Sequence, residues 1–403
     1  MELADILKRY LGIYLAKHRI SLWQHKILYD IQICRTVACG GHLETCDYCD
    51  YQRPAYNSCH NRHCPKCQGI ARRKWVSARL KELLPVPYYH VVFTMPHMLN
   101  TIALYNKQLI YNIFYQAAAY TLLKFGQDHK FLGAQLGFTG VLHTWGKGLI
   151  HHVHWHFIVP GGGLTKENRW VHLPYSDKFL FPATAMSKVI RGRFIKLFKR
   201  AYNEGKISIP DTQEALNNPL MFEYFLNDLA CEEWVNYCKP PFGGPEQVVK
   251  YIGRYTHRVA LSNNRLIDID GGRIRFYGKD HKEGKRVIIE LTAEEFIRRF
   301  LRHILPKDFR KIRYGGFLSA PIREAKIKAA RQALAGEGEK AFIDSVNSDI
   351  VESDGIDACP KCHIGVMRAV EIDKISRYRN FLLYMDSSKQ KQGANRENGI
   401  NAP

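Results

Sequence analysis

The sequence predicts an α+β fold, in which a small zinc-binding domain with helical flanks precedes a larger domain of strands and helices. The first observation is a cysteine cluster: seven of the 11 cysteines fall between Cys34 and Cys67 and include Cys-x-x-Cys pairs. The second is a series of short apolar runs typical of buried strands, separated by segments of helical periodicity. The chain has 403 residues, 46% of them hydrophobic, so two or three mostly globular domains are expected.

Charge narrows the class of partner. Lys and Arg outnumber Asp and Glu by 59 to 38, and the net charge of +21 favours nucleic acid or an anionic membrane surface. No apolar run long enough to span a membrane occurs, and the N-terminus lacks the regions of a signal peptide. Nucleic acid is therefore the expected partner, and a membrane is not. The cysteines are odd in number, cluster in Cys-x-x-Cys pairs and come without a secretion signal. Together these features indicate metal ligands in a reducing cytoplasm and argue against disulfides.

Hydrophobic periodicity and turn residues define the expected elements. In chain order they are an N-terminal helix with Leu3, Ile6, Leu7, Tyr10, Leu11 and Tyr14 on one face, a basic helix over 70–84, a buried strand over 88–94, a helical region over 98–126, strands near 137–145 and 152–159, a helix that begins at Pro245, strands near 273–277 and 286–291, and a helix near 293–304. The chain is divided accordingly into an N-terminal helix with the zinc-binding domain and a basic helix (1–84), the first half of the main sheet domain (85–164), a mostly helical basic insertion (165–240), the second half of that domain (241–320), a C-terminal region with a further Cys-x-x-Cys (321–385) and a polar tail expected to be disordered (386–403).

Cysteine spacing indicates a structural zinc site. Cys46-x-x-Cys49 and Cys64-x-x-Cys67 are separated by 14 residues, and two such turns can complete a tetrahedral four-thiolate site. Whether a second zinc ion is held by Cys39, His42, Cys59 and His63, or these side chains only pack locally, is left open. The pair Cys359-Pro-Lys-Cys362 has no evident partner, so a metal role there is weighed against an unoccupied turn. The residues just beyond the cluster that suit phosphate contacts are Arg72, Arg73 and Lys74.

A histidine pair on an expected strand forms a candidate site for a catalytic metal ion. Side chains alternate along a strand, so His154 and His156 share one face, which His152 shares by parity, while Trp155 packs behind. Two imidazoles on one face can hold a divalent ion and leave positions open for phosphate oxygens. His143 on the preceding strand is a candidate third ligand. A purely structural role for such a pair is the alternative.

Two tyrosines form a candidate nucleophile pair. Tyr251 and Tyr255 are four positions apart and lie on one face of the expected helix. Aromatic core packing is the alternative, but the basic residues crowded around them, Lys250, Arg254 and Arg258 among them, argue against burial on all sides and suit DNA phosphates. A phenol that attacks a phosphate would form a covalent 5′-phosphotyrosine and release a 3′-hydroxyl. That bond conserves the energy of the broken one, so no ATP is needed.

These motifs resemble those of a known family. The resemblance rests on an ordered series of segments, namely Tyr56-Asn-Ser-Cys59-His-Asn-Arg-His63-Cys64-Pro-Lys-Cys67, Tyr89-His-Val-Val-Phe-Thr-Met-Pro96, Gly140-Val-Leu-His-Thr-Trp-Gly146, His154-Trp-His156-Phe-Ile-Val-Pro-Gly-Gly163, Pro241-Phe-Gly-Gly-Pro-Glu-Gln247 and Tyr251-Ile-Gly-Arg-Tyr255-Thr-His-Arg258. The chain resembles the insertion-sequence ninety-one family of two-tyrosine HUH rolling-circle transposases, which carry an N-terminal zinc-binding domain. One departure is Val153, where proline is expected before the first metal histidine.

The resemblance implies an HUH endonuclease fold, an antiparallel sheet flanked by helices, and movement of an element as single-stranded DNA. It assigns His154 and His156 to binding of Mg²⁺ or Mn²⁺, and Tyr251 and Tyr255 to nucleophilic attack. The expected partners are single-stranded DNA at the element's ends and target DNA, in a bacterial cytoplasm at the nucleoid. A homo-oligomeric state is left open. The alternatives are a replication initiator of the same HUH class, a non-enzymatic zinc-dependent DNA-binding regulator, and a tyrosine recombinase, which needs no metal.

Overall fold

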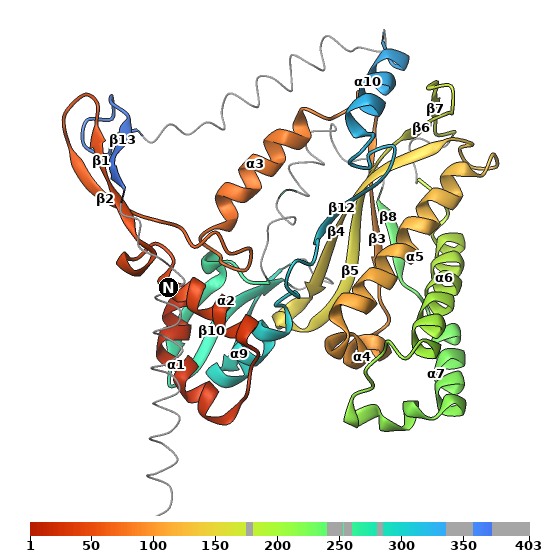
Figure 1. The fold of residues 1–403 in the computed structure, drawn as a ribbon, viewed down its shortest axis with the longest axis horizontal. Helices are drawn as coiled ribbons and strands as arrows, with labels where there is room; N and C mark the ends of the chain where they lie inside the picture. The colour runs from red at the N-terminus through yellow and green to blue at the C-terminus, as the bar shows by residue number, and fades with distance from the viewer. Residues whose placement is uncertain (175–179, 240–252, 254–259, 280–284, 336–357, 373–403) are drawn as a thin grey trace, which may run out of the picture.

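The computed structural model describes residues 1–174, 180–239, 253, 260–279, 285–335 and 358–372 (Figure 1). Several predicted site residues lie outside the described residues, namely Tyr251, Tyr255, Lys250, Arg254 and Arg258. The segment expected to be a polar tail, 386–403, also lies outside them. Within the described part of the chain, no helix is both long and apolar enough to cross a membrane.

The main body is built on a seven-stranded antiparallel sheet. Its strands are β3 (Tyr88–Thr94), β4 (Gln135–Trp145), β5 (His151–Pro160), β6 (Gly162–Leu164), β7 (Trp170–His172), β8 (Asn236–Lys239) and β12 (Ile312–Gly316). The order is β7-β6-β4-β5-β3-β8, and β12 pairs with β4 on the side away from β5. The expected α+β class, with an antiparallel sheet flanked by helices, is confirmed.

Four helices cover one face of this sheet, as Figure 1 shows. They are α4 (Asn100–Tyr105), α5 (Lys107–Gln127), α6 (Ala183–Asn203) and α7 (Pro219–Cys231). Because side chains alternate along β5, Val153, Trp155 and Phe157 point toward these helices and share one apolar core with them. The intervening histidines of β5 consequently face the other side of the sheet.

Two described helices pack on the opposite face. Helices α3 (Gln68–Leu80) and α10 (Arg323–Ala333) pack near Val141 of β4 and Ile158 of β5, in a second apolar cluster. Phe317, directly after β12, completes this cluster. The histidines of β5 precede Ile158 in the strand, so they lie beyond the end of the sheet that this cluster covers.

A separate core joins the N-terminus to the region after residue 260. Helices α1 (Leu3–Lys17) and α2 (Leu22–Ile33) pack against β9 (Leu266–Asp270), β10 (Arg273–Lys279), β11 (Arg286–Thr292) and α9 (Ala293–Arg302). Ser21 begins α2 with a capping box to Gln24, which explains why the expected single N-terminal helix is two. Residues 260–279 and 285–304 therefore pack with the N-terminal helices, whereas the sequence division grouped them with the sheet domain.

A small three-stranded sheet projects from this body (Figure 1). It contains β1 (Gly41–Cys46), β2 (Gln52–Tyr56) and β13 (Met367–Ile372), in the order β13-β1-β2. The C-terminal strand β13 thus pairs with the N-terminal hairpin, antiparallel, with Cys46 opposite Met367. This pairing joins Met367–Ile372, part of the expected C-terminal region 321–385, to the zinc-binding region.

Candidate functional site

Three histidines converge on the face of the main sheet that is turned away from α4–α7. His143 of β4 is paired directly with His154 of β5, and His156 lies two positions further along the same strand. One ring nitrogen from each of the three residues lies within 4.8 Å of those of the others. The ring centroids of His143 and His156 are 4.3 Å apart, and those of His154 and His156 are 4.7 Å apart. Neighbouring antiparallel strands therefore bring all three imidazoles to one point.

Hydrogen bonds orient two of these rings. The Nδ1 of His154 lies 3.0 Å from the backbone carbonyl of His152, and because a carbonyl only accepts, Nδ1 carries the proton. The Nε2 of His154 therefore keeps its lone pair. The Nδ1 of His156 lies 2.7 Å from Nε2 of His90 on β3. Such outer partners set the ring orientation of metal-binding histidines.

The environment keeps His156 neutral and partly encloses the site. His143 and His156 are buried, with 2% and 8% of their surfaces exposed, while His154 is half-buried. Burial lowers the pKa of His156 well below its usual value, and the neighbouring His143 and His154 lower it further. Burial also lowers the pKa of His90 to about 4. Neutral imidazoles with an accessible lone pair are the form that binds a divalent metal ion.

His90 is a site residue that sequence analysis missed. It lies on the expected strand 88–94, next to β5, and its ring stacks on His156 with centroids 5.0 Å apart. The available signal was a histidine inside an otherwise apolar strand run, Tyr-Tyr-His-Val-Val-Phe-Thr. His152, which shares the strand parity of the pair, does not join the group of three and instead stacks on His97.

One described residue of the tyrosine motif contacts helix α3. Gly253, between Tyr251 and Tyr255 in sequence, is buried against helix α3, where a Cβ atom would lie well under 3.0 Å from Cγ2 of Val76. The basic residues Arg72 and Arg73 precede Val76 by four and three positions, which places them on the same side of α3. They are exposed, as is Lys74. The predicted phosphate contacts and Gly253 thus lie on the same helix, α3.

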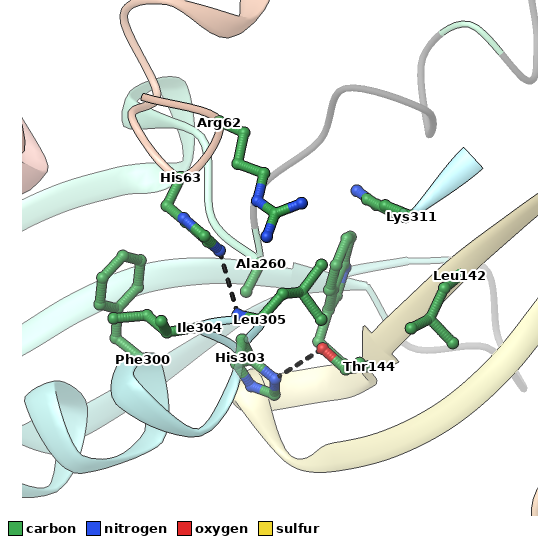
Figure 2. Close-up of a pocket in the computed structure, with 11 residues that line it drawn as sticks. Arg62, His63, Leu142, Thr144, Ala260, Phe300, His303, Ile304, Leu305 and Lys311 are labelled. Atoms are coloured by element: carbon green, nitrogen blue, oxygen red, sulfur yellow. Dashed lines mark hydrogen bonds between the residues drawn. The ribbon is translucent and has the colours of Figure 1, made fainter. Parts of the chain in front are cut away.

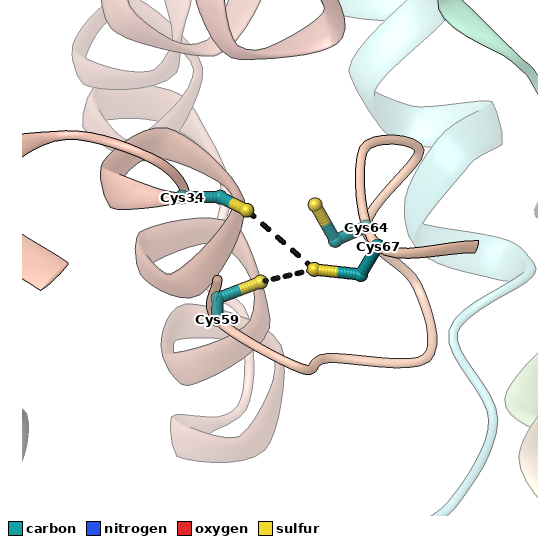
Figure 3. A group of neighbouring side chains, drawn as sticks. All are labelled: Cys34, Cys59, Cys64 and Cys67. Atoms are coloured by element: carbon teal, nitrogen blue, oxygen red, sulfur yellow. Dashed lines mark hydrogen bonds between the residues drawn. The ribbon is translucent and has the colours of Figure 1, made fainter. Parts of the chain in front are cut away.

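Four cysteines form a compact cluster at the base of the N-terminal region (Figure 3). Cys34 ends α2, Cys59 follows β2, and Cys64 and Cys67 precede α3, with Cys67 at its N-cap position. The Sγ atoms of Cys34 and Cys59 each lie 3.5 Å from that of Cys67. Four sulfurs bound to one zinc ion at roughly 2.3 Å are about 3.8 Å apart, so this geometry fits a structural tetrathiolate zinc centre.

The predicted pairing of cysteines is wrong. Cys64 and Cys67 gather with Cys34 and Cys59, whereas Cys46 and Cys49 lie with Cys359 and Cys362. The question left open for a second site is answered by the alternative, because Cys59 belongs to the first cluster and the three other residues pack or bond locally elsewhere. Cys39 is buried in the N-terminal core, His42 contacts Glu44 at 3.3 Å, and His63 Nε2 accepts a hydrogen bond from the backbone of Leu305 at 3.1 Å. Spacing alone did not reveal which pairs share a metal.

The loop of the first cysteine cluster is fastened to the rest of the protein (Figure 2). Arg62 donates to the backbone carbonyls of Phe309 and, at 2.6 Å, of Pro306. Burial lowers the pKa of the neighbouring His63 to about 3 and that of Lys311, across a cavity of about 20 Å³, to about 7. A neutral His63 can accept from Leu305 while its Nδ1 faces Asn61. The loop that carries the cluster therefore packs against the rest of the fold.

Comparisons with known proteins agree with this architecture. A family model described as "Transposase zinc-binding domain" matches residues 6–95, and one described as "Putative transposase" matches residues 137–326. A protein of Sinorhizobium fredii (strain NBRC 101917 / NGR234), "Putative transposase y4qJ", is 42% identical over 382 residues, which cover 92% of this chain and 95% of that protein. The "Transposase for insertion sequence element IS801" of Pseudomonas savastanoi pv. phaseolicola is 30% identical over 304 residues, which cover 73% of this chain and 68% of that protein. No solved structure matches the chain.

Proposed function

We infer, from the premise that this chain belongs to the insertion-sequence ninety-one (IS91) family of transposases, that it nicks and rejoins single-stranded DNA at the ends of its element. The observation that carries this proposal is the convergence of His143, His154 and His156 on one face of an antiparallel sheet. Its substrates are single-stranded element ends and target DNA in the bacterial cytoplasm, and the net charge of +21 supports such a polyanionic partner.

In this proposal the three imidazoles hold Mg²⁺ or Mn²⁺. When bound, the ion supplies Lewis-acid polarisation of the scissile phosphate and offsets charge in the transition state. His152, through its carbonyl, keeps His154 in the tautomer whose Nε2 binds metal, and His90 holds the ring of His156. The histidines come from two hydrogen-bonded strands of a packed sheet, so little reorganisation is needed before the metal binds.

The nucleophiles we assign are Tyr251 and Tyr255. One phenol oxygen attacks the phosphorus as its proton leaves, the P–O3′ bond breaks, and a 5′-phosphotyrosine and a free 3′-hydroxyl result. Attack of a 3′-hydroxyl on that phosphotyrosine restores the DNA bond and the phenol, which balances the cycle without ATP. Arg72, Arg73 and Lys74 on the neighbouring α3 hold the DNA backbone. Two tyrosines allow one DNA end to be retained while another is cut.

A nicking assay tests the proposal. Labelled single-stranded DNA that carries the element's ends is incubated with Mg²⁺ or Mn²⁺ and with the wild type, Tyr251→Phe, Tyr255→Phe or the double variant, each with and without chelator. We expect a covalent 5′ adduct that chelator abolishes and that the double variant lacks. An adduct that survives in the double variant would contradict the assignment of the nucleophiles, and DNA binding without any adduct would favour a regulator.

A matched pair of histidine variants tests the metal site. His154→Ala removes one of the three converging imidazoles, whereas His152→Ala removes a neighbouring imidazole of the same strand face that lies outside the group and leaves its carbonyl in place. We expect nicking to be lost in the first variant and retained in the second. Equal losses would mean that the strand is sensitive to any substitution and that the triad has no special role.

A further inference from the structure

Four cysteines from distant parts of the chain converge in the projecting three-stranded sheet. Cys46 ends β1, Cys49 lies in the turn after it, and Cys359 and Cys362 precede β13. The four Sγ atoms lie within 4.8 Å of one another. The Sγ–Sγ distance is 3.7 Å between Cys46 and Cys362, which are 316 positions apart, and also 3.7 Å between Cys49 and Cys359. These thiols are one group in space although they are far apart in sequence.

Each pair has the local geometry of a metal-binding turn. In the first turn, the backbone N–H groups of Tyr48 and Cys49 point to Sγ of Cys46, at 3.4 and 3.5 Å. In the second turn, Lys361 N–H points to Sγ of Cys359 at 3.4 Å, and Gly365 N–H points to Sγ of Cys362 at 3.3 Å. Backbone N–H groups directed at sulfur favour the thiolate, which is the form that binds metal.

We propose that Cys46, Cys49, Cys359 and Cys362 bind a zinc ion of their own, which joins the C-terminal strand to the N-terminal hairpin. A disulfide requires sulfurs about 2.05 Å apart, much closer than the observed 3.7 Å. Around a tetrahedral zinc ion with bonds of about 2.3 Å, sulfurs are roughly 3.8 Å apart. Four thiolates leave no open position, so this zinc ion is structural. The site needs Cys359 and Cys362, which lie outside the matched zinc-binding domain of residues 6–95.

Among the described residues, the apolar core around this site is small. The apolar cluster there has three buried members, Cys46, Cys359 and Met367, two of which are proposed ligands. Asp47 adds polar contacts, because its carboxylate accepts from Val366 N–H at 2.7 Å and from Arg368 Nε at 2.9 Å. A module with so small a core depends on a disulfide or a metal ion for its stability.

Gly365 carries a further constraint of the same site. A Cβ atom there would lie 2.5 Å from Sγ of Cys46 and 2.6 Å from Cβ of Tyr48. The backbone of the C-terminal segment therefore approaches the N-terminal turn as closely as glycine allows. This close approach accompanies the backbone bond from Cys359 N–H to the carbonyl of Gly365, 2.8 Å, which closes the second turn.

Metal content of the full-length protein tests the proposal. We expect two zinc ions per chain in the wild type, one in Cys359→Ser/Cys362→Ser, and two in the control Cys231→Ser/Cys238→Ser, whose thiols lie outside both clusters. Native mass spectrometry combined with elemental analysis gives both number and element. One zinc ion in the wild type, two in the Cys359→Ser/Cys362→Ser variant, or iron in place of zinc would overturn the proposal.

Maleimide labelling shows which thiols share a metal. In the zinc-loaded wild type we expect the exposed Cys231 to be modified and both clusters to be protected. In Cys359→Ser/Cys362→Ser, Cys46 and Cys49 should become reactive while Cys34, Cys59, Cys64 and Cys67 stay protected. Continued protection of Cys46 and Cys49 would refute the shared site. If that variant fails to fold, cadmium-113 resonance of the wild type still decides, because two signals in the four-sulfur range are expected and one would refute the proposal.

Discussion

Gly253 offers the sharpest test of how the tyrosine motif is positioned. It lies between the two proposed nucleophiles and packs on helix α3, and Gly253→Ala would place a methyl group well under 3.0 Å from Cγ2 of Val76. Carbon atoms in good contact are about 3.5–4.0 Å apart, so the two backbones must separate by more than about 1 Å. Val76 is β-branched and has few alternative rotamers that would relieve the overlap.

The expected cost follows from this overlap. Overpacking by one methyl group in a packed region typically costs about 1–3 kcal/mol. If that energy opposes the catalytic placement of the tyrosines, each 1.4 kcal/mol lowers the nicking rate about tenfold, so the loss is roughly 5- to 150-fold. Because the change affects placement and not the histidine triad, we expect the metal requirement of nicking to be unchanged.

A compensating variant separates this explanation from general damage. Val76→Ala removes the atom that Gly253→Ala would overlap, and Val76 is only half-buried, so its truncation is mild. Single-turnover nicking rates of the wild type, both single variants and the double variant form a double-mutant cycle. We expect the double variant to recover most of the rate lost in Gly253→Ala. If Gly253→Ala nicks at the wild-type rate, or if Val76→Ala brings no recovery, the proposed packing is refuted.

Three further outcomes are expected. His90→Phe removes the partner of His156 Nδ1, so the Mn²⁺ concentration needed for half-maximal nicking should rise 10- to 100-fold. His90→Gln keeps an acceptor, so this concentration should rise less in that variant. An unchanged metal requirement in His90→Phe would contradict the orienting role. Arg62→Ala leaves the carbonyls of Pro306 and Phe309 without their charged donor and should lower the free energy of unfolding in urea by about 2–3 kcal/mol, whereas a change below about 0.5 kcal/mol would show that the loop is held by other contacts. Burial lowers the pKa of His303 from 6.5 to about 4, so between these pH values the unfolded chain binds a proton that the folded chain does not. The free energy of unfolding should therefore fall as the pH falls from 6.5 to about 4. His303→Gln should flatten that part of a plot of urea midpoint against pH, and an unaltered slope would exclude His303 as its source.

Local patterns predicted much of the main sheet. The apolar run of β3, the alternation in β5 and the amphipathic face of α9 depend on neighbouring residues, so the expected ranges 88–94, 152–159 and 293–304 lie close to the observed elements. Strand parity also placed His154 and His156 on one face, and the structure brings His143 beside them, although metal binding by these three residues stays a prediction. The face on which a strand side chain lies can be predicted in this way because alternation depends on the local backbone and not on distant contacts.

The cysteine pairing could not be predicted because it depends on distant contacts. Cys34 is the C-cap of α2 and reaches the first cluster only because the N-terminal helices pack on β9–β11 and α9. Cys359 and Cys362 reach the hairpin because β13 pairs with β1, and a six-residue strand that ends the described chain carries no signal of its partner. The short strands β8 and β12 were missed for the same reason, since each is defined by the longer strand beside it.

Helix α3 links the first cysteine cluster to Gly253, which lies between the proposed nucleophiles in the sequence. Cys67 is the N-cap of α3, and Val76, nine positions later, lies about 13 Å along the helix axis, where it contacts Gly253. The start of α3 is positioned by its cysteines, and Arg79 near its end bonds the hydroxyl of Tyr314 on β12, a strand of the histidine-bearing sheet. A helix that is packed at both ends is displaced as one rigid element, because close-packed interiors are barely compressible and transmit strain. A structural zinc ion at the first cluster would therefore help to set the position of α3, and with it the contact between Val76 and Gly253.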